Sequence, residues 1–222
     1  MSIEPIRHLV VLAHPRRGSF NHQIADAYCE AVQSCGQVAY LRDLYANRFD
    51  PILEIIPEAP DLGILDDVAS VRNCDILTFV YPIWFGLPPA MIKGYVDRVL
   101  GAGFKPTSEQ PRGDGRFLGG KRLLSFTTSA STSAWLGEQG QLTTLRDGFD
   151  NYLATVFDLA STDHVHIDSI VDDLDPIYAK EQLERVRETA RKTCAELLNT
   201  ARRAETGRKV DAYARKIMDA KS

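Results

Sequence analysis

Five short apolar segments limit the folds open to this chain. The clearest is DILTFVY (75–81), which is nearly all apolar, as expected of a strand buried on both faces of a sheet. The other four expected strands are Ile6–Ala13, Gln37–Leu44, Arg122–Thr127 and, with a weaker pattern, Asp163–Asp168. Strands that alternate with helices predict a parallel sheet with right-handed crossovers.

Apolar residues at helical spacing predict the elements between these strands. We expect helices from Asn21 onward, over 62–73, over 90–100, over 145–160 and over 176–204. With 222 residues, 44% of them hydrophobic, the chain can bury one large core. We therefore expect one α/β domain over 1–204 and a charged tail over 205–222, which either continues the last helix or frays.

Composition argues against several classes of protein. A net charge of −4 gives no electrostatic case for nucleic acid binding. The four cysteines form no C-x-x-C pair and have no histidine at zinc-ligand spacing, so we expect reduced thiols and no metal site. No segment has the roughly 18 consecutive apolar residues of a membrane span, and no signal peptide is evident. We expect a cytoplasmic protein.

The position of three unusual loops predicts where a ligand binds. In an open parallel sheet, ligands lie outside the carboxyl ends of the strands, where the strand order reverses. Residues 14–21, 82–89 and 127–135 each follow an expected strand and so meet at that edge. Five strands fit the flavodoxin-like order 2-1-3-4-5, whose known ligand is a flavin.

The loop HPRRGSFN (14–21) leads from a strand into a helix and favours an anion site. A helix that begins there presents unpaired backbone N–H groups and the positive end of its dipole. The side chains available nearby are His14, Arg17, Ser19 and Asn21. The alternative is a turn in which Ser19 or Asn21 caps the helix. The signatures of Rossmann and P-loop nucleotide sites are absent from the sequence.

Two further loops predict the walls of the pocket. In PIWFG (82–86), two large aromatic residues beside a proline form a flat wall on which a planar heterocycle stacks, although an aromatic pair in the core is the alternative. In TTSASTS (127–133), Thr127 and Thr128 end a strand and form a second side of the pocket, unless the segment is only a flexible polar loop.

The segments LVVLAHP…GSFN, RDLY…FDP, YPIWFGLPPAMIKGYVDRVLGAGF and FTT occur in this order, and the sequence resembles the flavodoxin-like NAD(P)H:quinone oxidoreductases. The resemblance covers about residues 6–160, and its most specific part is 82–104. It implies a flavin-dependent enzyme that takes a hydride from NADH or NADPH and passes two electrons to a quinone in a ping-pong scheme. It also implies FAD, or alternatively FMN, as the cofactor and a homodimer as the assembly.

The resemblance assigns roles to individual residues. The flavin phosphates are expected at the first helix, and the isoalloxazine ring against the aromatic loop and the fourth strand. The cofactor-binding residues it implies are His14, Arg17, Gly18, Ser19, Phe20, Asn21, Pro82, Ile83, Trp84, Phe85, Thr127, Thr128, Ser129 and Ala130. Gly101, Phe104 and Pro106 are expected to face the pocket of a partner subunit.

The sequence departs from the family pattern at the catalytic positions. Many members follow the paired threonines with Gly-Gly and then place a Tyr and a His that offset charge on the reduced flavin. Here Ser129 and Ala130 follow, with Trp135 at the Tyr position and Gln141 at the His position. Trp135 has an N–H but releases no proton, and Gln141 donates a hydrogen bond but does not titrate. We expect these two as the catalytic residues, with altered proton handling.

Two rival functions stay open at this point. A flavin-binding electron carrier or redox-sensing regulatory subunit needs no nicotinamide site, so steady NAD(P)H oxidation distinguishes it from the enzyme. A nucleotide- or phosphate-binding protein of the same fold would contain no flavin and would be colourless when purified.

Overall fold

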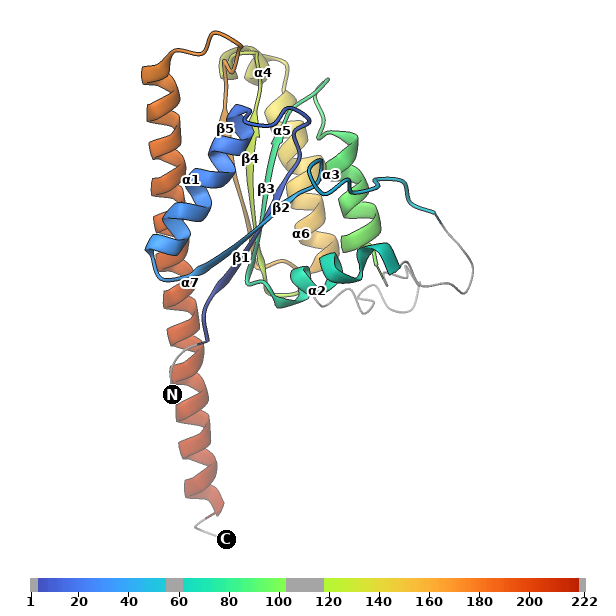
Figure 1. Ribbon diagram of the computed structural model, residues 1–222. Coiled ribbons are helices and arrows are strands. Elements are labelled where there is room, and N and C mark those ends of the chain that lie inside the picture. Colours follow the sequence, from blue (N-terminus) through green and yellow to red (C-terminus); the bar gives the residue numbers. More distant parts are fainter. Residues whose placement is uncertain (1–3, 55–61, 103–117, 220–222) are drawn as a thin grey trace.

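A computed structural model describes residues 4–54, 62–102 and 118–219 of the chain. Its centre is a parallel sheet of five strands in the order β2-β1-β3-β4-β5 (Figure 1). The strands are β1 (Arg7–Leu12), β2 (Val38–Asp43), β3 (Ile76–Pro82), β4 (Arg122–Thr128) and β5 (Ser161–Ile167). The predicted α/β class, flavodoxin-like strand order and five strands are confirmed.

Helices cover both faces of the sheet (Figure 1). Helices α1 (Phe20–Ser34) and α7 (Pro176–Asp219) lie on one face, where Tyr28 and Val186 pack with Val80 and Phe126. On the other face lie α2 (Leu65–Asn73), α3 (Ala90–Tyr95), and α6 (Tyr152–Phe157). Because β3 is central, all seven of its residues are buried, as its apolar run predicts.

The segment between β4 and β5 differs from the prediction. It contains a short helix α4 (Ser133–Glu138) and a second helical stretch that begins at α5 (Gln141–Leu145), whereas we expected a loop up to about residue 145. Gly137 and Gly140 interrupt the apolar periodicity, and Gly140 takes the positive φ of 67° that separates the two helices. Apolar periodicity therefore did not predict α4, which is shorter than two turns, or the start of the next helix at Gln141.

Two of the three predicted helices on the α3 and α6 side contain a π-helical turn. Residues Val96–Leu100 continue α3, and residues Arg146–Asn151 join α5 to α6. A π turn inserts one extra residue per turn and often accompanies a functional site. Asp150 lies in the second of these turns and is buried.

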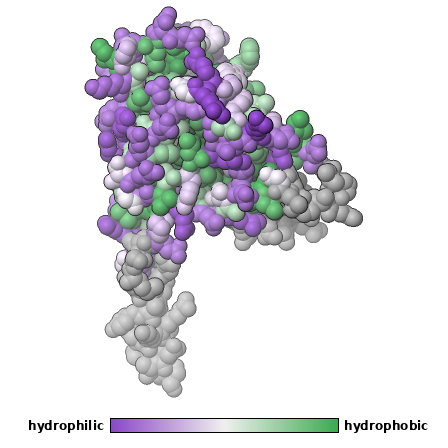
Figure 2. Space-filling view, viewed as in Figure 1, coloured by the Kyte–Doolittle hydropathy of each residue, from purple (hydrophilic) through white to green (hydrophobic). Residues whose placement is uncertain are grey.

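The last helix continues through the expected tail. α7 has no break at residue 204 and its second half projects past the sheet (Figure 1), so of the two alternatives the tail is helical. On the face in Figure 2, hydrophilic side chains cover most of the surface and hydrophobic ones lie between them in small groups. None of the described helices has the length and apolar composition required to cross a bilayer.

Candidate active site

A cavity of about 390 Å³ lies at the carboxyl ends of the strands, where the strand order reverses between β1 and β3. The three predicted loops meet there. The predicted residues that line it are His14, Ser19, Phe20, Asn21, Pro82, Ile83, Trp84, Thr128, Ser129 and Ala130.

The N-terminus of α1 forms one end of the cavity. Ser19 stands at the N-cap position, but its side chain does not cap the helix, and the first turn of α1 contains no acidic residue. Of the first-turn N–H groups, that of His22 donates to the Ser19 carbonyl at 2.9 Å, whereas those of Phe20 and Asn21 have no residue earlier in the helix to accept them. No acidic side chain of the first turn offsets the positive end of the helix dipole. The local geometry is that of an anion site rather than of a capped helix.

The Ser19 hydroxyl has a partner within α1. Its Oγ lies 2.8 Å from Nδ1 of His22, and Nε2 of His22 lies 3.2 Å from Oδ2 of Asp43. The Asp43 carboxylate only accepts, so the His22 Nε2 carries the proton of that bond. His22 therefore connects the start of α1 to the end of β2.

Asn21 links two of the loops. It is 2% exposed, and its Nδ2 donates to Thr128 Oγ1 at 2.9 Å. Its Oδ1 is buried and has no hydrogen-bond partner among the described residues. A half-turn of the amide keeps the bond, because the Thr128 hydroxyl also donates, and presents an N–H to the cavity instead. Asn21 therefore offers a ligand one unused polar atom.

His14 and Trp84 approach each other across the cavity. Their ring centroids are 6.2 Å apart, and His14 Nδ1 accepts from the Arg16 backbone N–H at 3.1 Å. Burial lowers the pKa of His14, with His22 and Arg16 adding to the effect and a hydrogen bond to the Arg16 backbone opposing it. His14 is thus neutral at neutral pH and contributes shape and hydrogen bonding rather than a fixed charge.

The loop after β3 closes in a tight turn. Trp84 and Leu87 exchange both backbone hydrogen bonds at 3.1 Å, and between them Phe85 and Gly86 have φ angles of 50° and 82°. Two positive φ values in succession suit glycine or asparagine, and a phenylalanine there is strained. Phe85 is fully exposed and does not line the cavity, whereas Trp84 does.

Several predicted residues lie outside the cavity lining. Thr127 is buried and hydrogen-bonds to His164 and His166 on β5. Arg17 and Gly18 are exposed in the turn before α1, and the neighbouring Arg16 takes the place in the lining.

The two predicted catalytic residues occupy different positions relative to the cavity. Trp135 is 53% exposed on α4, which lies above the carboxyl ends of β4 and β5 (Figure 1). Gln141 Nε2 donates to the Gly86 carbonyl at 2.7 Å, and a Cβ on Gly86 would lie 2.5 Å from that amide. Neither residue lines the cavity. Gln141 instead fixes the aromatic loop, and Trp135 is exposed on α4.

The sequence reasoning missed one wall. Ile170, Val171 and Asp172, after β5, complete the lining, and Asp172 forms an exposed ion pair with Arg16 at 2.9 Å. The rule that used the ends of the other strands applies equally to β5 and would have found this loop. Of the residues expected at a partner subunit, Gly101 ends the π turn after α3, and Phe104 and Pro106 lie outside the described residues.

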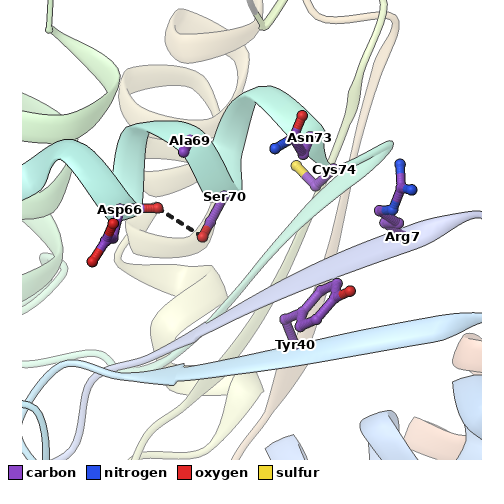
Figure 3. A pocket seen from close by; sticks show the side chains of 7 residues that line it. All are labelled: Arg7, Tyr40, Asp66, Ala69, Ser70, Asn73 and Cys74. Atoms are coloured by element: carbon purple, nitrogen blue, oxygen red, sulfur yellow. Dashed lines mark hydrogen bonds between the residues drawn. The ribbon is translucent and has the colours of Figure 1, made fainter.

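A larger cavity, of about 570 Å³, lies near the amino ends of the strands (Figure 3). Its lining comes from α2, the start of β1 and the edge strand β2, with Arg7 and Tyr40 facing Ser70 and Asn73. The dashed line in Figure 3 marks the hydrogen bond from the Ser70 hydroxyl to the Asp66 carbonyl within α2. The first turn of α2 reaches this cavity through Asp66, and the two acidic residues of that turn, Asp66 and Asp67, disfavour an anion there.

The chain belongs to the family described as flavodoxin-like fold, which it matches over residues 6–196. It is similar to NAD(P)H dehydrogenase (quinone) 1 of Cavia porcellus, with 34% identity over 155 residues, covering 58% of this chain and 55% of that protein. The chain thus spans about half the length of that relative.

Two solved structures show the same fold. NAD(P)H:quinone oxidoreductase from Methanothermobacter marburgensis superposes with a TM-score of 0.72 at 19% identity, covering 85% of this chain and 96% of that one. An FMN-dependent NADH-azoreductase from Bacillus anthracis, in complex with FMN, gives a TM-score of 0.58 at 15% identity, covering 86% and 99%.

Proposed function

We propose that this chain is a flavin-dependent NAD(P)H:quinone oxidoreductase. It takes a hydride from NADH or NADPH and passes two electrons to a quinone-like acceptor, in a ping-pong scheme within one cavity. The observation that carries the proposal is the uncapped N-terminus of α1, which shares the cavity with the ring of Trp84 at the strand-order reversal. The names of the relatives agree with it.

The residues present fit a flavin. A phosphate suits the first-turn N–H groups of α1, where no acidic side chain opposes it. A planar ring suits the partly exposed face of Trp84, beside Pro82 and Ile83. The unused amide atom of Asn21 suits a polar group of the ligand between these two ends.

The bound flavin would supply the hydride chemistry, and the protein supplies position, electrostatics and a dry surface. Trp84, Pro82 and Ile83 exclude water from one side, and the hydroxyls of Thr128 and Ser129 provide polar contacts on the other. Trp135, which is exposed on α4, contacts the nicotinamide and the acceptor in turn in this proposal. Gln141 acts through the aromatic loop, whose Gly86 carbonyl it holds.

We also propose a homodimer. Phe85 keeps a strained backbone while its side chain is fully exposed, and Leu87 beside it is 61% exposed. A strained backbone that carries an exposed apolar side chain is expected where burial of that side chain against a partner subunit offsets the strain. Light scattering after size-exclusion chromatography tests the dimer, and a monomeric Phe85→Asn variant would support this position of the interface.

The cofactor and compartment complete the proposal. FAD, or alternatively FMN, fills the site, and an FMN complex among the similar folds supports the second choice. All four cysteines are free thiols, which agrees with a cytoplasmic location.

Three measurements test the function. The purified protein should be yellow, and mass spectrometry of the released cofactor should identify FAD or FMN. NADH or NADPH should be oxidised steadily with menadione as acceptor. A yellow protein without turnover would be an electron carrier or redox sensor, and a colourless protein that takes up no added flavin would contradict the proposal.

A further inference from the structure

A buried chain of hydrogen bonds leads away from the active-site cavity. Ser129 Oγ lies 3.1 Å from His166 Nε2, and His166 Nδ1 lies 2.9 Å from Thr127 Oγ1. Thr127 Oγ1 lies 2.7 Å from His164 Nε2, and His164 Nδ1 lies 2.5 Å from Asp150 Oδ2. Five side chains thus form one continuous path.

The sheet register builds this path. Thr127 of β4 pairs with His166 of β5, and alternate residues along parallel neighbouring strands share a face. His164 therefore lies next to Thr127 on the same face. Asp150 reaches His164 from the π-helical turn above that face, where the extra residue of the turn brings its carboxylate inward.

The two ends of the path open into different cavities. Ser129 lines the active-site cavity. Asp150 and His164 line a separate polar cavity of about 300 Å³, together with Arg146, Asn151, Thr162 and Asp163. Between the two ends, Thr127 and His166 are buried.

The donors along the path can be ordered from one fixed contact. Ser129 Oγ donates to the Ser131 carbonyl at 2.7 Å, so His166 Nε2 must donate to Ser129. A neutral His166 then accepts at Nδ1 from the Thr127 hydroxyl, which in turn accepts from the Nε2–H of His164. From His164 through Thr127 and His166 to Ser129, each hydrogen bond is therefore donated in the direction of the active site.

His166 has the protonation state that this order needs. Burial lowers its pKa to about 4, and His164, Arg146 and Arg185 act in the same direction while Asp168 opposes them. At neutral pH the ring carries one proton, so it donates at one nitrogen and accepts at the other. Thr127 and Ser129 likewise accept and donate through one oxygen each.

We propose that Asp150, His164, Thr127, His166 and Ser129 form a proton relay from the outer cavity to the active site. The relay rests on the proposed function. Reduction of a quinone to a hydroquinone consumes two electrons and two protons, and a hydride supplies two electrons and one proton. The second proton enters at Asp150 and His164; each group along the path gives one proton and takes one, and Ser129 delivers one into the cavity. Trp135 and Gln141 cannot supply it, because neither titrates.

Breaking the path at Thr127 tests the relay. The NADH-reduced protein is mixed with a water-soluble benzoquinone in weak buffer with a pH-indicator dye. In Thr127→Val, reoxidation and proton uptake should slow by at least about tenfold, within the contribution of a positioned proton donor. Reduction by NADH should be unchanged. Thr127→Ser should restore uptake, and Ser125→Ala, which removes a bond to Asp150 outside the path, is the matched control.

Two results of this experiment would overturn the relay. One is wild-type proton uptake in Thr127→Val. The other is an equal slowing of both half-reactions, since the loss would then lie in packing or binding rather than in proton supply. A protein that binds no flavin would overturn the proposed function instead.

Nitrogen NMR of the histidine rings tests the path without turnover. His166→Gln and His164→Gln assign the signals. At pH 7 the wild-type His166 should carry one ring proton, on Nε2, and Thr127→Val should shift the ring nitrogens of both histidines that face position 127. A doubly protonated His166, or a Thr127→Val spectrum that leaves either ring unchanged, contradicts the relay.

Discussion

The two ends of the sheet each carry a cavity, and the larger one is not the candidate site. The cavity at the amino ends measures about 570 Å³ and the one at the carboxyl ends about 390 Å³. The larger is lined by side chains of α2 and two strand segments (Figure 3), whereas four loops converge on the smaller.

The difference lies in what the backbone presents. In a parallel sheet each strand enters a helix at the carboxyl end, so helix N-termini and their unpaired N–H groups gather there. At the smaller cavity, α1 presents such a terminus uncapped and Asn21 holds an unused polar atom. At the larger cavity, the first turn of α2 contains Asp66 and Asp67, whose carboxylates offset the positive end of the helix dipole. Convergent donors, rather than volume, mark the site.

The largest expected effect comes from replacing Ser19 and Asn21 together by leucine. The ligand would lose polar contacts and meet apolar surface at the start of α1. Hydrogen bonds to charged groups contribute roughly 1.5 to 3 kcal/mol each, so flavin affinity should fall by at least about a hundredfold. Equilibrium dialysis with FMN or FAD measures the change.

The matched control places leucines in the other cavity. Ser70→Leu with Asn73→Leu changes two polar residues that are exposed on α2, and flavin affinity should not change. A folded Ser19→Leu, Asn21→Leu variant with full flavin occupancy would contradict the assignment of the flavin site to the carboxyl ends of the strands.

A smaller effect is expected from substitutions at Trp135. Trp135→Phe keeps an aromatic ring and removes one N–H, worth about 0.5 to 1.5 kcal/mol, so the rate should fall by up to roughly tenfold. Trp135→Ala also removes the ring and should lose more activity, with flavin still bound in both. Stopped-flow traces of both half-reactions measure this. An alanine variant as fast as wild type would place Trp135 outside the reaction.

Buried histidines give the two ends a shared pH dependence. His8, at the amino end, has a pKa lowered by burial and is held by Tyr28 and Gln37, and the pKa of His166 at the carboxyl end is lowered to about 4. The folded state then binds fewer protons than the unfolded state. The free energy of unfolding should therefore fall as pH drops below the ordinary histidine value of about 6.5, and for His166 the fall ends near its folded pKa.

Substitution separates the two histidines. His166→Gln should flatten the loss of melting temperature between pH 6.5 and 4 by a few degrees. His8→Gln should also reduce the loss of melting temperature on acidification, because it removes the buried histidine at the amino end of the sheet. If both variants follow the wild-type curve, acid unfolding comes from the carboxylates instead.

The strands β1, β3 and β4 were predictable because burial on both faces leaves nearly continuous apolar runs in the sequence. The edge strands β2 and β5 are only partly buried and leave weaker patterns. The apolar run of β3 and the breaks after β1, β3 and β4 were sufficient to locate the cavity. The short helix α4 was not predictable, because it has less than two turns of pattern, and the next helix was predicted to start only at residue 145 although it begins at Gln141, directly after Gly140. Their stability comes from packing that a local pattern does not contain.

Side-chain direction in irregular loops was the other limit. Arg16 rather than Arg17 lines the cavity, and nothing periodic in the turn distinguishes them. Thr127 was expected at the flavin, but its side chain points to the face of the sheet on which it hydrogen-bonds to His164 and His166 of β5. The sequence shows these histidines only as part of a weak strand pattern. Their contact with Thr127 depends on the register between β4 and β5, which the sequence does not show.

The smallest effect is expected from removing residues 206–222, because the described part of this segment, 206–219, lies at the end of α7 that is far from the site (Figure 1). The buried residues of α7 are Val186, Ala190, Thr193, Cys194 and Leu197, whereas 202–204, 206, 207 and 210 are exposed. Because this part of the helix projects past the sheet (Figure 1), its loss removes little buried surface. Flavin binding should be unchanged, and the free energy of unfolding should change by no more than about 0.5 kcal/mol. Equilibrium dialysis and urea unfolding measure the two quantities. A large loss of stability would show that the projecting half of α7 packs on a partner subunit, and the amino end of the sheet would then contribute to assembly while the carboxyl end holds the chemistry.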